Sequence, residues 1–288
     1  MKLAQLSRND SDSYSLAVVL DGSAIFTSDL GLGFTTLQEL ITAGETGLQQ
    51  LHEALATAPD SIATPLTELR YAPAVTTPPI TLAVGLNYSE HASELKLDND
   101  SGPVLFSLFP NSLAPHNGTV ELPTDQSTEV DYEGELGVII GKPAKNVQLA
   151  DALDYVFGYT VVNDLTARNI QFTEPQWSRC KSFDGFTPVG PVVVTADEIL
   201  DPQNLRITTD IDGLRVQDDT TGHMIRSVAE LIVSLSRSLT LLPGTLISTG
   251  SPGGAGRSRK PPLYLKQGTV ATVTIEKIGA LTTHAVEI

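Results

Sequence analysis

Two glutamates that are separated by a single residue lie at the start of an apolar stretch near the middle of the chain. Glu133 and Glu135 precede residues 136–140, a run of apolar residues rich in β-branched side chains that is typical of a buried strand. Alternate side chains of a strand point to one face, so the two carboxylates are expected roughly 7 Å apart along the backbone. They repel each other unless a cation lies between them or one of them stays protonated. The spacing therefore predicts a site that requires a positively charged partner.

A third carboxylate follows a second apolar stretch. Residues 156–163 predict a strand, and Asp164 comes at its end, before a stretch that predicts a helix. By itself, an aspartate at this place is typical of a helix N-cap. Together with Glu133 and Glu135 it makes an all-oxygen set that suits Mg²⁺, with Mn²⁺ or Ca²⁺ as alternatives. No histidine and cysteine cluster with the spacing of a zinc site competes with this interpretation.

Two further stretches carry residues that could act on a substrate. His91 and Glu94 lie one turn apart in a predicted short helix, where the carboxylate could orient the imidazole as a general base toward water. The other interpretation is a surface pair, which the spacing alone favours. Lys181 lies among aromatic residues and could hold a substrate carboxylate, or could pair with Asp184 for structural reasons.

Residues 245–256 predict a strand that runs into a glycine-rich loop. The loop lacks the Gly-Lys-Ser/Thr of a P-loop and the following helix of a dinucleotide-binding fold, which argues against both nucleotide sites. Its backbone N–H groups and the Thr249 hydroxyl could still bind a small anion such as a carboxylate. Cys180 is the one cysteine, which excludes an intramolecular disulfide, and we interpret it as a small buried side chain.

Charge and composition exclude several classes of partner. Eighteen basic and 34 acidic residues give a formal net charge of −16, and no block of Lys and Arg could follow a phosphate backbone. Nucleic acid and anionic membranes are therefore poor partners. With 41% hydrophobic and 18% charged residues, the composition is that of a soluble globular protein. No run of 18 apolar residues and no signal-peptide pattern occurs, so we expect a cytoplasmic protein.

The elements that must position these residues are mostly strands. Asp21-Gly22 and Asp212-Gly213 each predict the turn of a β-hairpin. Residues 36–56 predict an amphipathic helix interrupted around Gly44 and Gly47, and residues 227–239 predict a helix that begins with a capping box. The class expected from these elements is α+β, predominantly β.

Five prolines between residues 59 and 79 mark the expected boundary of a small N-terminal α/β module. The module spans residues 1–70, and residues 71–288 form the expected catalytic domain. A proline-rich stretch can equally be an ordered connection at a sheet edge.

Five motifs occur in the order found in the fumarylacetoacetate hydrolase family, which the chain resembles over roughly residues 78–288. The motifs are Asn87-Tyr88 with His91 and Glu94, Asp131-Tyr132-Glu133-Gly134-Glu135-Leu136, Asn163-Asp164-Leu165-Thr166-Ala167-Arg168, Lys181-Ser182-Phe183-Asp184-Gly185-Phe186 with Pro188 and Gly190-Pro191, and Thr249-Gly250-Ser251-Pro252.

The resemblance implies a mixed β-sandwich roll, usually a homodimer, with Mg²⁺ or Mn²⁺ held by Glu133, Glu135 and Asp164. It also implies that His91 and Glu94 lie on a segment that closes over the site, and it makes Lys181 a catalytic residue. The residues implied at the substrate, a 2-oxo acid, are Tyr88, Gln171, Thr249 and Gly250, together with Arg168, which resembles a supporting arginine.

Three functions are consistent with these residues. A metal-dependent hydrolase of acylpyruvate-type 2-oxo acids uses both the three carboxylates and the His91/Glu94 pair. A decarboxylase or keto-enol tautomerase of oxaloacetate-like acids requires only stabilisation of an enolate. A non-catalytic binding protein predicts gaps in the site, and none is seen. Leu108 and Ser251 stand where many family members have lysine and threonine, and Ala255 replaces a larger residue, so the substrate stays open.

Overall fold

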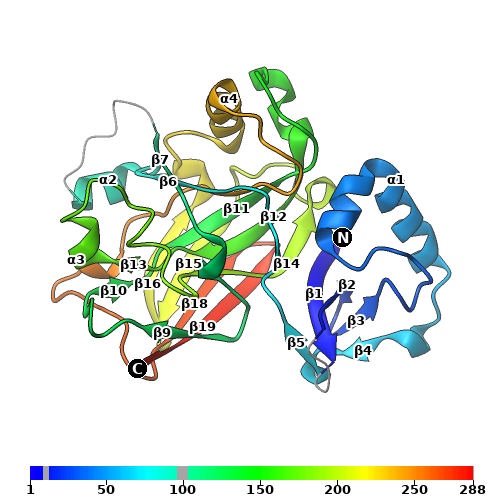
Figure 1. The fold of residues 1–288 in the computed structure, drawn as a ribbon, viewed down its shortest axis with the longest axis horizontal. Helices are drawn as coiled ribbons and strands as arrows, with labels where there is room; N and C mark the ends of the chain where they lie inside the picture. The colour runs from blue at the N-terminus through cyan, green and yellow to red at the C-terminus, as the bar shows by residue number, and fades with distance from the viewer. Residues whose placement is uncertain (9–12, 96–102, 288) are drawn as a thin grey trace.

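Two facing β-sheets form the body of the protein, with helices along their margins (Figure 1). The computed structural model describes residues 1–8, 13–95 and 103–287, without the side chains of Asp60, His91, Ala92 and Leu95. Strands predominate over helices, which confirms the expected α+β, predominantly β class.

The larger sheet contains the strands that carry the predicted site. Its strands, in spatial order, are β4 (Thr64–Pro65), β3 (Ser23–Phe26), β2 (Ser15–Leu20), β1 (Lys2–Arg8), β14 (Thr187–Thr195), β12 (Val156–Asn163), β11 (Gly134–Ile140), β17 (Leu246–Ser248), β6 (Thr81–Gly85) and β7 (Val104–Ser107). Two short strands join this sheet at its sides: β5 (Leu69–Tyr71), which pairs with β1, and β8 (Leu113–Ala114), which pairs with β14.

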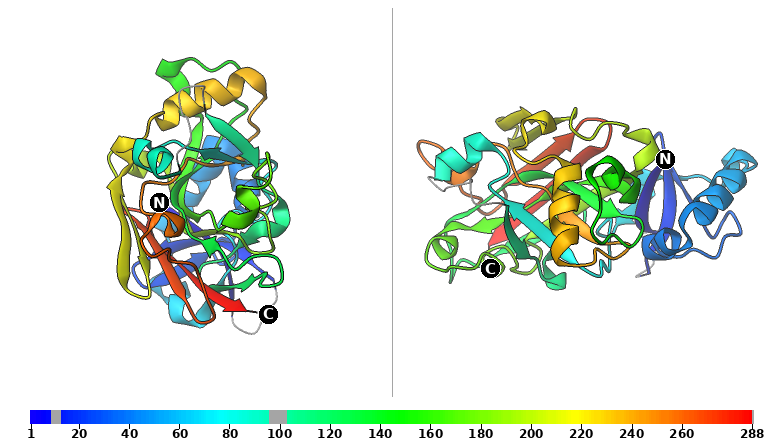
Figure 2. Two further views of the ribbon diagram at one scale, coloured as in Figure 1. Left: turned by 90° about the vertical axis from the view of Figure 1, so that its left-hand side faces the viewer. Right: turned by 90° about the horizontal axis from the view of Figure 1, so that it is seen from above.

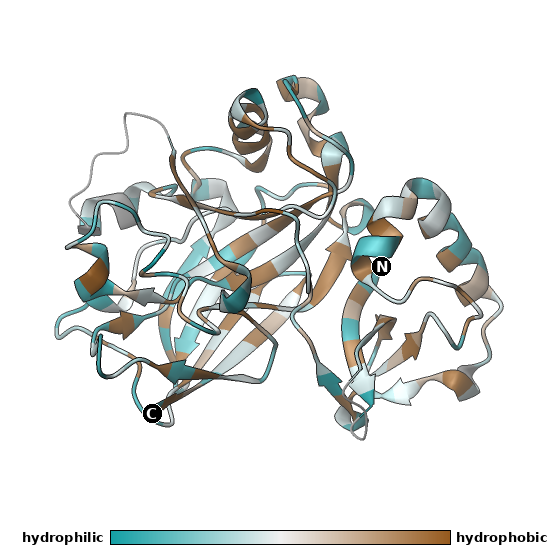
Figure 3. Cartoon of the chain, viewed as in Figure 1, coloured by the Kyte–Doolittle hydropathy of each residue, from teal (hydrophilic) through white to brown (hydrophobic). Residues whose placement is uncertain are grey.

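The second sheet faces the first. Its strands, in spatial order, are β16 (Leu214–Thr220), β15 (Arg206–Ile211), β18 (Val270–Ile275), β19 (Gly279–Glu287) and β9 (Gly118–Leu122). A separate ladder joins β10 (Val130–Asp131) to β13 (Thr166–Ala167) beside the predicted site. Alternate residues of β11 and β12 meet those of β15 and β18 in one apolar cluster that includes Leu136, Val138, Val161, Ile207 and Val273. Figure 3 shows apolar residues along these central strands.

The helices begin where the sequence predicts them. They are α1 (Leu37–Ala56), α2 (Ser89–Leu95), α3 (Arg168–Gln171) and α4 (Val228–Ser238). Thr36 and Ser227 form capping boxes at the starts of α1 and α4, and α1 is kinked at Gly44, where φ is 59°. The helix expected after Asp164 begins only at Arg168, because β13 takes up residues 166–167, and α3 is four residues long.

Both predicted hairpins are present. β2 and β3 are joined at Asp21-Gly22, and β15 and β16 are joined at Asp212-Gly213. Asp212 and Gly213 have φ values of 50° and 81°, the left-handed conformation that a tight two-residue hairpin requires at both positions.

The N-terminal residues continue the large sheet instead of forming a sheet of their own. Strand β1 pairs with β14, with Lys2 opposite Val194, and β2, β3 and β4 extend the sheet beyond it. These strands and α1 lie at one end of the molecule's longest axis (Figure 2). The proline-rich connection contributes β4 at the sheet edge and β5 beside β1. A division at residue 70 stays a prediction, since hydrogen bonds of one sheet cross it.

Gly134, between Glu133 and Glu135, lies where strand β11 packs closely against the second sheet. A Cβ atom on Gly134 would lie 2.5 Å from Thr209 Oγ1 and 2.9 Å from Val273 Cγ1, both in the second sheet. These neighbours are buried, so they have little room to move. Only glycine therefore lets β11 approach the second sheet this closely between Glu133 and Glu135.

We expect Gly134→Ala to lower the free energy of unfolding by about 1–3 kcal/mol, because the added methyl group overpacks a closed interface. Thermal unfolding followed by circular dichroism measures the change. Gly33→Ala is the matched control, since a Cβ atom there meets no atom within 4 Å. Equal melting temperatures for Gly134→Ala and the wild type would contradict this account of the interface.

Candidate active site

Pairing of β11 with β12 brings the three predicted ligand carboxylates together. Gly134 lies opposite Asn163, and the Asp164 N–H donates to the Glu133 carbonyl at 2.8 Å. Glu133, Glu135 and Asp164 are each at least 96% buried, and each offers an oxygen within 4.8 Å of the others. The geometry expected from two strand ends is therefore present.

A buried arginine joins Glu133 to another carboxylate. Arg168 donates from Nε to Asp131 Oδ1 at 2.6 Å and from Nη2 to Glu133 Oε1 at 2.6 Å. Its Nη1 donates to Gln171 Oε1 at 2.9 Å. Arg168 is fully buried, and although burial opposes it, the two carboxylates raise its pKa. The predicted supporting role of Arg168 agrees with these contacts, whereas Asp131 carried no predicted role.

Lys181 lies between two of the predicted metal ligands. Its Nζ donates to Asp164 Oδ2 at 2.5 Å, to Glu133 Oε2 at 2.7 Å and to Thr166 Oγ1 at 3.0 Å. The alternative pairing with Asp184 is wrong, because Asp184 accepts a hydrogen bond from Asn111 instead. Burial opposes the charged form, but Asp164 and Glu133 raise the pKa of Lys181, which is therefore an ammonium ion.

The buried charges do not balance. The acidic centre, as we name it, contains four carboxylates and two cations: Asp131, Glu133, Glu135, Asp164, Arg168 and Lys181. If all six are ionised, the four negative and two positive charges leave a net charge of −2. Burial, helped by Asp164 and Glu133, raises the pKa of Glu135 to about 8, and burial raises that of Asp164 to about 6.

These residues fit a divalent cation. The Oδ1 atom of Asp164 is buried and has no hydrogen-bond partner among the described residues. The three carboxylates each offer an oxygen within 4.8 Å of the others, whereas oxygens about 2.1 Å from a magnesium ion lie at most about 4.2 Å apart, so small side-chain shifts would bring them to an ion. A charge of +2 also cancels the excess negative charge. Glu135 is held in place by Ser248 Oγ at 2.5 Å and the Gly250 N–H at 2.8 Å.

A small cavity adjoins the acidic centre. This centre cavity has a free volume of about 10 Å³, and its lining includes Gln171, Lys181, Ser251 and Trp177. Such a volume is enough for about one water molecule or one ion, and too small for a substrate. Trp177 was missed by the sequence analysis. It lies beside Gly85, where a Cβ atom would come within 2.4 Å of the indole ring, and edge-to-face with Phe106.

The residues predicted to contact the substrate lie around the acidic centre, but they differ in whether they line the centre cavity. Gln171 lines the centre cavity. The Gly250 N–H donates to Glu135, and the buried Thr249 hydroxyl donates to the Leu136 carbonyl at 2.8 Å. In this conformation both residues therefore support strand β11, the ligand strand, which carries Glu135. Tyr88 is buried with its hydroxyl unpaired among the described residues, and burial, with Asp219 and Glu135, raises its pKa. Their contacts with substrate stay predictions.

The predicted general-base helix packs on the glycine-rich loop. Glu94, on α2, accepts hydrogen bonds from the Gly254 N–H at 2.9 and 3.1 Å. A Cβ atom on Gly253 would lie 2.6 Å from Glu90 Cγ, so the exposed Glu90 side chain of α2 also contacts this loop. The side chain of His91 lies outside the described part of the structure, so its pairing with Glu94 stays a prediction.

Gln217 connects the ligand strand to this loop, and no motif in the sequence indicated it. Its Oε1 accepts hydrogen bonds from the Gly134 N–H at 3.0 Å and Thr209 Oγ1 at 2.7 Å. Its Nε2 donates to Ser251 Oγ at 2.9 Å and the Pro252 carbonyl at 2.9 Å. A single buried amide thus holds the backbone between Glu133 and Glu135 against the loop.

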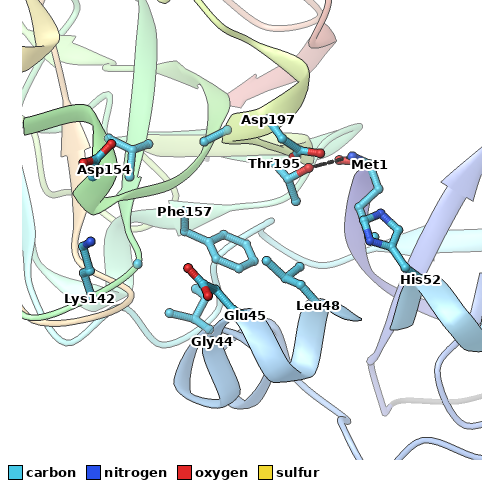
Figure 4. Close-up of a pocket in the computed structure, with 14 residues that line it drawn as sticks. Met1, Gly44, Glu45, Leu48, His52, Lys142, Asp154, Phe157, Thr195 and Asp197 are labelled. Atoms are coloured by element: carbon cyan, nitrogen blue, oxygen red, sulfur yellow. Dashed lines mark hydrogen bonds between the residues drawn. The ribbon is translucent and has the colours of Figure 1, made fainter. Parts of the chain in front are cut away.

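A larger cavity lies elsewhere and lacks comparable chemistry. It has a volume of about 510 Å³ and lies between α1 and the ends of β12 and β14, around Leu48 and Phe157 (Figure 4). The residues predicted for catalysis, substrate or metal do not line it. The candidate active site is therefore the acidic centre.

Two other predictions concern features outside the acidic centre. Cys180 is buried as expected, and burial raises the pKa of its thiol to about 12. Among the described residues, no helix has the length and apolar character needed to cross a membrane.

Comparison with known proteins agrees with this fold and shows the family. A family model described as "Fumarylacetoacetate (FAA) hydrolase C-terminal" matches residues 81–286. An uncharacterized protein of Staphylococcus aureus strain USA300 is 37% identical over 303 residues, with 99% of each chain covered.

Three solved structures are similar over the whole chain. Fumarylacetoacetate hydrolase from Exiguobacterium antarcticum is 33% identical with a TM-score of 0.86, covering 100% of both chains. 5-Carboxymethyl-2-hydroxymuconate delta-isomerase from Mycobacterium smegmatis is 29% identical with a TM-score of 0.77, covering 100% of this chain and 99% of that one. Maleylpyruvate hydrolase from Sphingobium sp. SYK-6, in complex with manganese(II) and pyruvate, shares the fold at 24% identity and a TM-score of 0.81, with 100% and 99% coverage. The chain therefore belongs to the fumarylacetoacetate hydrolase family.

Proposed function

We propose that the protein is a metal-dependent hydrolase that cleaves a C–C bond in acylpyruvate-type 2-oxo acids. Water and R–CO–CH₂–CO–COO⁻ would give R–COO⁻, pyruvate and a proton. The observation that carries the proposal is the buried excess of carboxylates, with the unpaired Asp164 Oδ1, beside the predicted general-base helix α2. The family's hydrolases are consistent with this activity.

Glu133, Glu135 and Asp164 would hold the ion, either Mg²⁺ or Mn²⁺. When bound, such an ion is a Lewis acid that stabilises negative charge developing on the 2-oxo group of the substrate. The related maleylpyruvate hydrolase was solved with manganese(II) and pyruvate, which is the metal and product class proposed here. Arg168 donates to Glu133 Oε1 and holds that carboxylate in place.

Lys181 is placed to act on the substrate next to the ligand carboxylates. Its ammonium group is held by Glu133 and Asp164 at the centre cavity, and Gln171 lines the same cavity. To bind the carboxylate or oxo oxygens of the pyruvate half, Lys181 would exchange one of its three hydrogen bonds, to Glu133, Asp164 or Thr166, for one to the substrate. We assign His91, on α2, the role of general base that takes a proton from water as it attacks the distal carbonyl. Glu94 fixes the end of that helix on Gly254.

An isomerase or decarboxylase that acts through the same enolate is the alternative. The observation that favours isomerisation is the 29% identity to a structure named as a delta-isomerase, over the whole chain. Both alternative reactions stabilise an enolate without hydrolytic water, so His91 would then be dispensable or would move a proton between carbon atoms.

A side-by-side assay distinguishes these reactions. We expect the protein with Mg²⁺ or Mn²⁺ to convert acetylpyruvate to acetate and pyruvate, and to lose this activity with chelator. Product analysis by NMR is the measurement, with oxaloacetate as the second substrate. Pyruvate and CO₂ from oxaloacetate without cleavage of acetylpyruvate would reject the hydrolase in favour of the decarboxylase. Turnover that is unchanged by chelator would reject the metal.

Glu135→Gln separates metal binding from folding. In the metal-free protein Glu135 is protonated below a pKa of about 8, so the neutral glutamine changes the melting temperature little. The rise in melting temperature that Mg²⁺ or Mn²⁺ causes in the wild type is expected to disappear, together with turnover. A wild-type metal response in Glu135→Gln would show that the ion is bound elsewhere.

The same carboxyl group gives metal binding a defined pH dependence. The ion must displace its proton, so the metal affinity of the wild type rises about tenfold per pH unit between about pH 6 and 8, then levels off. Without metal, the raised pKa means that the folded protein binds more protons than the unfolded chain. Stability of the metal-free protein therefore falls as the pH rises from 4.5 to about 8.

His91→Ala tests the proposed general base. We expect kcat for acetylpyruvate to fall by roughly 10²–10⁴-fold, while metal binding measured by calorimetry is retained. His52→Ala, which removes an exposed histidine of α1, is the matched control and should keep wild-type turnover. Full kcat in His91→Ala would remove this histidine from the mechanism.

A further inference from the structure

Part of the lining of the centre cavity is apolar. Val84 and Gly85, at the end of β6, line it together with Leu86 and the indole of Trp177, and we name these four residues the apolar wall. The other residues that line the cavity are the carboxylates and polar side chains of the site. A 2-oxo acid that places its oxygen atoms among those polar groups therefore has its carbon chain against the apolar wall.

The backbone at the end of β6 makes room for the indole beside the cavity. A Cβ atom on Gly85 would lie 2.4 Å from Cζ3 of Trp177, so a side chain at this position would displace the ring from the wall. Leu86 has a φ of 60°, in the left-handed region that leucine rarely adopts, and its side chain is buried. Such backbone strain persists only where the surrounding structure holds it, and it occurs mostly at ligand sites and active sites. Two consecutive residues therefore shape the wall around the indole.

The indole is held by residues that do not belong to α2. Its ring lies edge-to-face with that of Phe106 on β7, with 5.7 Å between the ring centres, and it also packs against Leu86. The Trp177 carbonyl accepts a hydrogen bond from the Cys180 thiol at 3.1 Å. Phe106 in turn lies 5.4 Å from Lys181 Nζ, measured to the ring centre. When α2 moves to admit a substrate, these contacts keep the indole beside the acidic centre.

We propose that Trp177 is a specificity-determining residue that restricts the substrate to 2-oxo acids without a branch at C3, the carbon next to the oxo group. This inference rests on the proposed function for the position of the 2-oxo end at the acidic centre. In an acylpyruvate, C3 is the methylene group between two carbonyls and carries one further carbon, so it fits beside a flat ring. A second carbon on C3 would overlap the indole or Leu86, and a packed wall has little room to yield.

Binding of two isomers tests this assignment: 2-oxopentanoate, which is unbranched at C3, and 3-methyl-2-oxobutanoate, whose C3 is branched. Both have the same charge and the same atoms, so the ratio of their Kd values reports the shape of the site at C3. By titration calorimetry with Mg²⁺ present, we expect the wild type to bind 2-oxopentanoate roughly tenfold more tightly. In Trp177→Ala this ratio is expected to fall to within about twofold, because the missing ring leaves room for the branch.

Matched variants keep the result interpretable. Trp177→Phe retains a ring against Phe106 and should lower the ratio to roughly threefold, so it replaces Trp177→Ala if that variant fails to fold. Leu105→Ala shortens a side chain of β7 that does not line the centre cavity, and it should keep the wild-type ratio.

Two outcomes overturn the proposal. One is a wild type that binds both isomers equally well. The other is a Trp177 variant in which both ligands lose affinity together and the ratio stays unchanged, as a purely structural role of the indole predicts. Failure to hydrolyse acetylpyruvate would count against the proposed function and leave this ratio measurable.

Discussion

The buried excess of negative charge at the start of β11 is the constraint on which the rest of the site depends. Arg168 and Lys181 supply two positive charges against four carboxylates, and both cations are nearly inaccessible to solvent. Uncompensated buried charge is strongly unfavourable, so the centre must take up protons or a cation. The raised pKa values of Glu135 and Asp164 describe the first outcome, and a divalent ion is the second. The same carboxylates therefore account for the proposed metal affinity and its pH dependence, and for the ammonium form of Lys181 between Glu133 and Asp164.

Such a centre requires a backbone that cannot relax away from the repulsion. The fold supplies it by placing the carboxylates at the ends of two central antiparallel strands, packed against a second sheet. Gly134 permits the close approach, and Gln217 binds both that glycine and the Ser251 loop. Because Gln217 comes from the second sheet, the distance between the sheets fixes the position of the ligand strand relative to the loop. The packing that stabilises the two sheets therefore also sets the geometry of the site.

Local patterns were enough to predict the parts of this arrangement that depend on neighbouring residues. The hairpin at Asp212-Gly213 and the capping box at Ser227 follow from short-range rules, and the two-residue spacing of Glu133 and Glu135 gave the repulsion directly. The meeting of Asp164 with those glutamates needed the family's ordered motifs, since strand pairing is not encoded locally. Gln217, Trp177 and the Asp131–Arg168 pair were missed because their roles come mostly from contacts between residues 34 to 92 positions apart. For Lys181 the sequence left two alternatives, and the pairing with Asp184 is excluded only by contacts in the fold, because Lys181 donates to Glu133, Asp164 and Thr166.

The small volume of the centre cavity identifies which side of the site must move to admit a substrate. On the sheet side, Glu133, Glu135, Asp164 and Lys181 are held by a continuous set of buried hydrogen bonds, so displacing one of them exposes an unpaired charge. On the other side, α2 is held to the loop through Glu94 at Gly254 and through close contact of Glu90 with Gly253, both near solvent. These partly exposed contacts of α2 cost less to break than the buried network. We therefore expect a substrate to reach the acidic centre from the side of α2.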